Sequence, residues 1–166
     1  MRHQHVTQIR NVLTAIEVED RFLKRSEYAR REQQATIADL LAENTFEVVG
    51  RDGGPYRLVI STIGARLTLR ISSAGGAPVA THIMSFRPLA RVIREYVTIC
   101  HSHYDLASSR NPFHIEALDM GRRALHNEGS QLLREKINDK IIVDDDTGRR
   151  LFTLICVSAI GLSATL

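Results

Sequence analysis

The sequence predicts an α+β fold in which an antiparallel β-meander of about four to five strands packs against a C-terminal group of helices, with one N-terminal helix. Apolar and polar residues alternate in the first half, whereas from Pro88 onward apolar residues recur with a helical period. The length of 166 residues, with 43% apolar and 25% charged residues, suits one globular domain. We therefore expect a single domain over 1–166, with a strand-rich half at 1–86 and a helical half at 87–166.

The first half opens with a predicted edge strand at Val6–Thr14 and a helix at Tyr28–Glu43. A strand at Phe46–Val49 then leads through the turn sequence Asp52-Gly-Gly-Pro55 into a strand at Tyr56–Ile63. A hairpin is expected there.

Two further strands complete the predicted meander. In Arg66–Ser72, every second residue is apolar, which indicates one buried and one solvated face. The turn sequence Ala74-Gly-Gly-Ala77 connects it to a strand at Pro78–Ser85.

The helical half begins at Pro88, which suits the first helical position, and an apolar stripe follows to Tyr104. Asn111 is a predicted N-cap for the next helix, which extends toward Ile137. Gly129 leaves two alternatives, a continuous helix or a break.

Asp144 to Asp146 precede a final helix that is apolar on nearly every side and is therefore expected to be buried. Leu151–Leu166 carries no charge but is shorter than the ~20 residues that span a bilayer. No segment resembles a signal peptide, and Cys100 and Cys156 show no disulfide framework. We expect a cytoplasmic protein without membrane association.

The chain contains the frame Asp-x-Gly-Arg-Arg twice, at 119–123 and at 146–150. A guanidinium stays charged and offers five donors, so two such arginine pairs imply carboxylate or anion partners.

A helical projection of the first copy predicts a polar stripe that is a candidate ligand-binding face. The stripe comprises Asp119, Arg123, His126, Asn127, Ser130 and Arg134. Arg122 falls on the opposite, apolar face, where an unpaired charge is costly. We expect an internal clamp between Arg122 and Glu128 or one of Asp144 to Asp146, with an anion site or a subunit interface as alternatives.

In the second copy, Arg149 and Arg150 lie in the first turn of the final helix, where cations are unfavourable. Asp146 is expected to cap this helix, and Asp144 or Asp145 to pair with an arginine. The predicted structural ion-pair network comprises Arg122, Asp144, Asp145, Asp146, Arg149 and Arg150. Phosphate binding at this helix end is the alternative.

His126 and Glu128 are the candidate catalytic residues, because an imidazole near a carboxylate can act as an acid or base. On a continuous helix the two side chains point in different directions, so this role requires a break at Gly129.

No metal or cofactor is expected. Cys100, His101 and His103 do not share one side of a helix, and chelation of copper or nickel by Met1-Arg2-His3 would be adventitious. Walker, Rossmann and nucleophile-elbow signatures are absent.

The predicted meander bears an outer row of arginines, Arg57, Arg66 and Arg70, that is expected to be a solvated face. The net charge of only +3 and the low aromatic content of 5% argue against a dedicated nucleic-acid reader.

Several segments together resemble an uncharacterised alphaproteobacterial protein family, UPF family 0262, a domain of unknown function. They are Gly54-Pro-Tyr56, Ile115-Glu-Ala-Leu-Asp-Met-Gly-Arg-Arg123, Leu125-His-Asn-Glu-Gly-Ser130 and 146–157. The resemblance implies a bacterial cytoplasmic protein but no activity, cofactor or catalytic residue. The chain departs from the family pattern at His101, His103 and the C-terminal tail.

We therefore expect a non-enzymatic binding or regulatory module that recognises a protein partner or an anionic ligand through its arginine-rich helical face. Weak nucleic-acid binding and a homodimer are compatible with this interpretation. The alternatives are an enzyme for a phosphorylated or nucleotide-like substrate, with His126 as acid-base, and a structural or assembly protein with an apolar surface patch.

Overall fold

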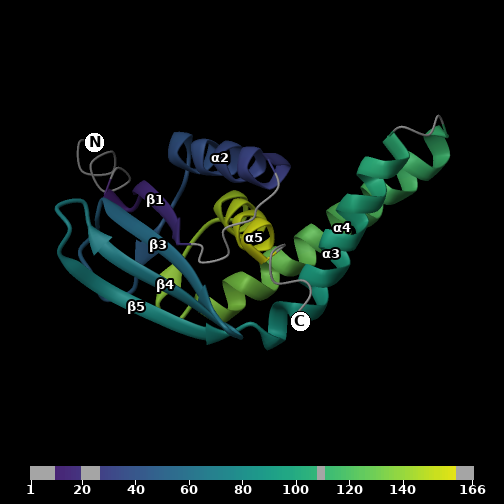
Figure 1. Ribbon diagram of the computed structural model, residues 1–166. Helices are drawn as coiled ribbons and strands as arrows, with labels where there is room; N and C mark the ends of the chain where they lie inside the picture. The colour runs from purple at the N-terminus through teal and green to yellow at the C-terminus, as the bar shows by residue number, and fades with distance from the viewer. Residues whose placement is uncertain (1–9, 20–26, 108–110, 160–166) are drawn as a thin grey trace.

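The computed structural model describes residues 10–19, 27–107 and 111–159, and it is an α+β structure, as predicted (Figure 1). The main sheet has four strands in the order β1-β3-β4-β5. These strands are β1 (Leu13–Glu19), β3 (Tyr56–Ile63), β4 (Arg66–Ser73) and β5 (Pro78–Ser85). The antiparallel pairs β3–β4 and β4–β5 form the predicted meander.

The edge strand of the sheet differs from its prediction. Strand β1 begins at Leu13, whereas the predicted strand ends at Thr14 and residues 6–9 lie outside the described part of the chain. It pairs with β3 in parallel, with Ile16 opposite Leu58. A parallel pair requires a crossover, and the connection from β1 to β3 contains helix α2 (Glu27–Ala42). The sheet is therefore mixed.

A small second sheet replaces the predicted hairpin. Strand β2 (Glu47–Val48) pairs with β6 (Ile141–Ile142) from the far end of the chain, not with β3. The backbone N–H of Val49 extends this contact by donating to the carbonyl of Lys140 at 2.9 Å. The hairpin prediction was wrong. The two-residue strand β2 pairs with β6, a segment far away in the sequence, and the turn sequence before β3 does not reveal that partner.

The helices after the sheet are α3 (Arg87–Ala107), α4 (Pro112–Ile137) and α5 (Asp145–Ala159). The Asn111 side chain accepts a hydrogen bond from the N–H of Phe113, which confirms the predicted N-cap. Helix α4 continues through Gly129, so the alternative of a break there was wrong. The described part of the final helix is buried from Leu151 onward except at the half-buried Thr153, as predicted.

The hydrophobic core forms between the inner face of the sheet and the helices. Its centre is closed almost completely, because a void of only about 10 Å³ remains there. The side chains around this void come from both halves of the chain: Phe46, Leu58, Ile60, Leu69, Leu133, Ile137, Leu151 and Ile155. Helices α4 and α5 are therefore held against the sheet by apolar burial.

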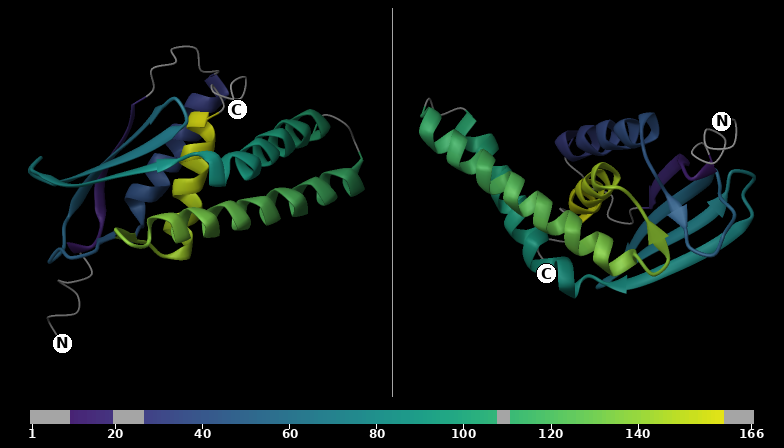
Figure 2. Two further views of the ribbon diagram at one scale, coloured as in Figure 1. Left: turned by 90° about the horizontal axis from the view of Figure 1, so that it is seen from below. Right: turned by 180° about the vertical axis from the view of Figure 1, so that it is seen from behind.

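Helices α3 and α4 run side by side and extend beyond the sheet as an arm (Figures 1 and 2). The fully buried residues of α4 are Gly129, Ser130, Leu133 and Ile137, all in its C-terminal half. We define the arm as residues 112–124 of α4 together with the adjoining part of α3. Only the C-terminal half of α4 contributes to the core.

Candidate functional site

The candidate site lies where the C-terminal half of α4 crosses the start of α5. Gly148 permits this close crossing, because an added Cβ would lie 2.7 Å from Cδ of Arg134. Gly129 permits a second one, since a Cβ there would lie 2.1 Å from Cζ of Phe152. The ring of Phe152 is therefore the group that approaches the α4 backbone at Gly129.

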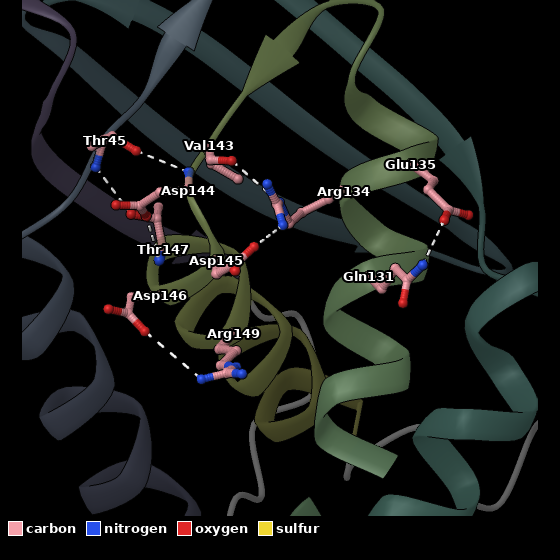
Figure 3. A network of polar contacts seen from close by, with 10 residues as sticks. All are labelled: Thr45, Gln131, Arg134, Glu135, Val143, Asp144, Asp145, Asp146, Thr147 and Arg149. Atoms are coloured by element: carbon pink, nitrogen blue, oxygen red, sulfur yellow. Dashed lines mark hydrogen bonds and ion pairs between the residues drawn. The ribbon is translucent and has the colours of Figure 1, made fainter. Parts of the chain in front are cut away.

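The first turn of α5 is held by a group of hydrogen bonds around Asp144 (Figure 3). The Asp144 carboxylate accepts from the N–H of Thr147 at 2.8 Å, so Asp144 is the N-cap where Asp146 was expected. Thr45 fastens this turn to the chain before β2, because its hydroxyl accepts from the N–H of Asp144 and its own N–H donates to the hydroxyl of Thr147. Burial raises the pKa of Asp144, but the hydrogen bonds from Thr147 and Thr45 outweigh it and hold the pKa below its ordinary value.

Arg134 connects α4 to the same turn (Figure 3). Its guanidinium pairs with the carboxylate of Asp145, and its Nε donates to the carbonyl of Val143 at 3.2 Å. The Arg134 side chain is 38% exposed, so part of it still faces solvent. A predicted ligand residue therefore forms part of an ion pair that ties two elements together.

An open cleft of about 460 Å³ lies beside this ion pair. Its walls combine amide, hydroxyl and guanidinium groups with one carboxylate: Asn127, Ser130, Gln131, Arg134, Asp145 and Arg149. A second cleft of about 290 Å³ lies on the side of Arg134 toward β6. Arg134 and Gln131 line both, so Arg134 is the shared wall of the two clefts.

Arg149 is the less constrained of the two cleft arginines. Its Nη1 lies 3.9 Å from a carboxylate oxygen of Asp146, which is a charge contact without hydrogen-bond distance (Figure 3). The Arg149 side chain is 46% exposed. This guanidinium can therefore turn toward a group in the cleft without breaking a hydrogen bond to Asp146.

The predicted polar stripe separates into two groups. Asn127, Ser130 and Arg134 line the cleft, whereas Asp119 and Arg123 lie in the arm. The carboxylate of Asp119 binds both Arg122 at 2.8 Å and Arg123 at 2.7 Å. Eleven residues of helix separate Arg123 from Arg134, a rise of about 16 Å. One small ligand cannot contact both arginines.

The predicted clamp of Arg122 with Glu128 or the aspartates of α5 was wrong. Arg122 pairs with Asp119 one turn earlier, and its side chain is 35% exposed. The Asp119 carboxylate and the Tyr96 hydroxyl hold the pKa of Arg122 above its ordinary value. The projection placed Arg122 opposite Asp119 and Arg123, but both arginines pair with the Asp119 carboxylate, which is within reach on the same helix.

His126 and Glu128 do not cooperate in this structure. The Nε2 of His126 lies 2.7 Å from the hydroxyl of Thr153 on α5, and its ring packs against Tyr96 and Phe152 with centroids 5.5 and 5.7 Å away. Burial lowers the pKa of His126. Glu128 pairs with Arg91 on α3. The continuous helix directs the two side chains to different neighbours, so they form no acid-base pair.

The predicted network of the second copy is partly present. Asp145 pairs with Arg134 and Asp146 faces Arg149, while Asp144 serves as the cap. Arg150 donates to the carbonyl of Glu43 at 2.8 Å, at the end of α2. These contacts join α5 to α4 and to the end of α2.

Sequence reasoning missed the roles of Thr45, Thr147 and Gln131. Asp144 had a local signal, since aspartate is a preferred N-cap residue whose side chain accepts from the N–H two or three residues later. The role of Thr45 could not be predicted from local sequence, because Thr45 and Asp144 are 99 residues apart in the chain.

Within residues 10–19, 27–107 and 111–159, no group of three or more His, Cys, Asp and Glu side chains could hold a metal ion. The side chains of His101 and His103, and the segment Met1-Arg2-His3, lie outside what the structure describes. Cys100 and Cys156 are free thiols, and burial raises the pKa of both.

The sequence matches the family model described as Uncharacterised protein family (UPF0262) over residues 10–160. The chain belongs to this family. It is 54% identical over 126 residues to a UPF0262 protein of Rhizobium meliloti (strain 1021), which covers 76% of this chain and 80% of the relative. A UPF0262 protein of Mesorhizobium japonicum is 46% identical over 151 residues, covering 90% of this chain and 94% of the relative.

A further UPF0262 protein, from Chelativorans sp. (strain BNC1), is 54% identical over 127 residues, or 76% of this chain and 79% of the relative. No solved structure matches the chain. In the described part of this UPF0262 protein, no helix combines the length and the apolar character needed to cross a membrane. The names of these relatives assign no activity, so the function has to be argued from the site.

Proposed function

We propose that this UPF0262 protein is a non-enzymatic binding module that holds an anionic group, a carboxylate or a phosphate, in the cleft between α4 and α5. The supporting observation is the position of Arg149 in the cleft wall. Its guanidinium is half-exposed and lies 3.9 Å from Asp146, the carboxylate with which it pairs. An oxyanion in the cleft offers hydrogen bonds at shorter range, and charge-assisted hydrogen bonds of this kind are the stronger ones.

The other cleft residues suit the same chemistry. The amide groups of Asn127 and Gln131 and the hydroxyl of Ser130 can donate hydrogen bonds to an oxyanion. Arg134 lies in the same wall but is occupied by Asp145. A ligand anion would therefore compete with the Asp145 carboxylate for Arg134, which makes Asp145 an internal occupant of this site.

This proposal moves the expected ligand contacts along α4. Arg123 is held by Asp119 in the arm, about 16 Å from Arg134 along the helix, and is left out of the site. The enzymatic alternative gains no support, because His126 is bonded to Thr153 and packed between two rings.

The test is an NMR titration of the full chain with inorganic phosphate, and separately with acetate, observing the arginine Nε–H signals. We expect saturable shifts at Arg149 and Arg134. Arg149→Ala should abolish saturation at Arg134, while Arg57→Ala, on an exposed residue of β3, should leave it intact. Asp145→Asn should tighten binding, because it removes the charge that competes for Arg134.

Two outcomes would contradict the proposal. One is a weak, unsaturable shift of equal size at every exposed arginine, which is the behaviour of nonspecific ion atmosphere. The other is saturable binding that survives Arg149→Ala. Because the Arg149 side chain is half-exposed, the melting temperature should remain close to that of the parent, so lost binding is not explained by unfolding.

A further inference from the structure

The arm carries an apolar stripe on α4 that lies farther from the core than the cleft, on the same side of the helix as the cleft residues Asn127 and Gln131. The stripe comprises Phe113, Ala117, Met120 and Ala124, all exposed, with Phe113 80% and Met120 66% exposed. Their spacing of four, three and four residues is the heptad spacing of a helix–helix seam. At 100° per residue, the four side chains fall within about 60° of one another around the helix.

This apolar character is confined to the arm. The same line along α4 continues toward the core as Asn127 and Gln131, which are exposed and polar. Other parts of α4 are in contact within this chain, because Gly121 meets Ile99 of α3 and His126 meets Thr153 of α5. An exposed Phe and Met on a protruding arm, aligned in a seam, are features of a contact surface.

We propose that the arm is a self-association surface, on which α4 of a second copy of this chain packs antiparallel. A two-fold axis near residues 118 and 119 would place each seam residue opposite a different seam residue of the other copy. Phe113 would face the partner's Ala124, and Ala117 would face the partner's Met120.

Side-chain size favours this arrangement. In the antiparallel register every large seam residue meets an alanine, so the two seams interdigitate at uniform helix spacing. In a parallel arrangement Phe113 would face the partner's Phe113, and Ala117 would face the partner's Ala117. Layers with two large side chains would then alternate with layers that hold two alanines and leave a gap.

The charges beside the seam favour it as well. Glu116 and Arg123 are both exposed and flank the seam on the same side, the first less than one turn before its centre and the second just over one turn after it. In the antiparallel register Glu116 faces the partner's Arg123, and the two-fold axis creates this ion pair twice. Arg123 already pairs with Asp119 in this chain and would share its guanidinium with the partner's Glu116. In a parallel register Arg123 would instead approach the partner's Glu128, which is itself bound by Arg91.

The contact is short. The seam from Phe113 to Ala124 spans about 16 Å of helix, which is less than a permanent dimer interface needs. We therefore expect a reversible dimer whose population depends on protein concentration.

The test is sedimentation velocity of the full chain over a series from micromolar to millimolar concentration. We expect a monomer–dimer equilibrium. Met120→Glu buries a charge in the seam and should lower the association constant by at least about tenfold. Thr98→Glu, which adds the same charge at an exposed position of α3, is the control and should leave association unchanged.

A charge exchange tests the orientation. Glu116→Arg alone and Arg123→Glu alone should each weaken the dimer, and the double variant should restore it. Circular dichroism melting of each variant confirms that the monomer is folded. The proposal is overturned by a chain that stays monomeric at millimolar concentration, by a dimer insensitive to Met120→Glu, or by a double variant that remains as weak as the single ones.

Discussion

His82 lies on the inner face of β5, opposite Leu69 of β4, and only 7% of it is exposed. Neither ring nitrogen has a hydrogen-bond partner among the described residues. Burial, and then the nearby charge of Lys140, lower the pKa of His82 from its ordinary value of 6.5. Burial within the sheet therefore disfavours the protonated form of His82.

This burial predicts that the protein loses stability in mild acid. The unfolded chain binds a proton at His82 more readily than the folded chain, so its contribution is fully present above pH 6.5 and is lost as the pH falls toward the lower folded pKa. We expect the free energy of unfolding from urea titrations to decline between pH 7.5 and pH 5, as linkage requires.

His82→Leu removes this group and should flatten that decline. The pKa of His126 is also lowered by burial. In His82→Leu, the free energy of unfolding should therefore still decline in acid, but less steeply than in the parent. Equal slopes for the parent and His82→Leu would contradict the prediction.

At the scale of elements, the doubled Gly-Arg-Arg frame marks two helix crossings. Gly121 meets Ile99 of α3, and Gly148 meets the stem of Arg134 of α4. In both copies the glycine brings a neighbouring helix close and the arginines find carboxylate or carbonyl partners. In each copy, the glycine therefore allows a close helix crossing, although the two copies lie in different helices.

Gly129 and Gly121 lie on the same helix but should respond differently to alanine. At Gly129 the new Cβ would lie 2.1 Å from the Phe152 ring in the core, which forces the ring or the helix to move. We expect a net loss of at least about 1 kcal/mol, because the strain of overpacking exceeds the gain in helix propensity.

Gly121→Ala is the matched substitution. Its Cβ would meet the end of the Ile99 side chain at 2.7 Å, and a terminal methyl can turn aside. We expect stability to stay within about 0.5 kcal/mol of the parent or to rise, since alanine favours helix. Urea unfolding measures the change in the free energy of unfolding for each variant. Equal losses at the two positions would show that the contact with the Phe152 ring does not cause the loss at Gly129.

On the scale of the whole molecule, the protein consists of a packed body and a projecting arm. The body buries the inner face of the sheet under α4 and α5, with α2 alongside, whereas the arm portion of α4 has no fully buried residue (Figure 2). Local stability follows buried apolar contact, so the two parts should not open together.

Amide hydrogen exchange measured by mass spectrometry should show this difference. In dilute protein, we expect amides between Ile115 and Met120 to exchange faster than those between Gly129 and Ile137, because only the second group is packed in the core. Uniform protection along α4 would contradict this prediction. Raising the protein concentration should slow exchange in the arm if the self-association surface is occupied.

Much of the local structure could be predicted from the sequence. The strands at Tyr56–Ile63 and Pro78–Ser85 have the predicted bounds, and the N-cap at Asn111 was correct. The alternation of a strand, the period of a helix and a helix cap all depend on residues within a few positions of one another. They can therefore be predicted from the sequence.

The partners of these elements were decided only by the tertiary structure. Strand β2 pairs with β6, β1 lies parallel to β3, His126 bonds to Thr153, and Arg134 takes Asp145. A periodic pattern states which face of an element is apolar, but not which distant face will cover it. The cleft between α4 and α5 is a consequence of such a long-range contact, so its residues could be named from the sequence only in part.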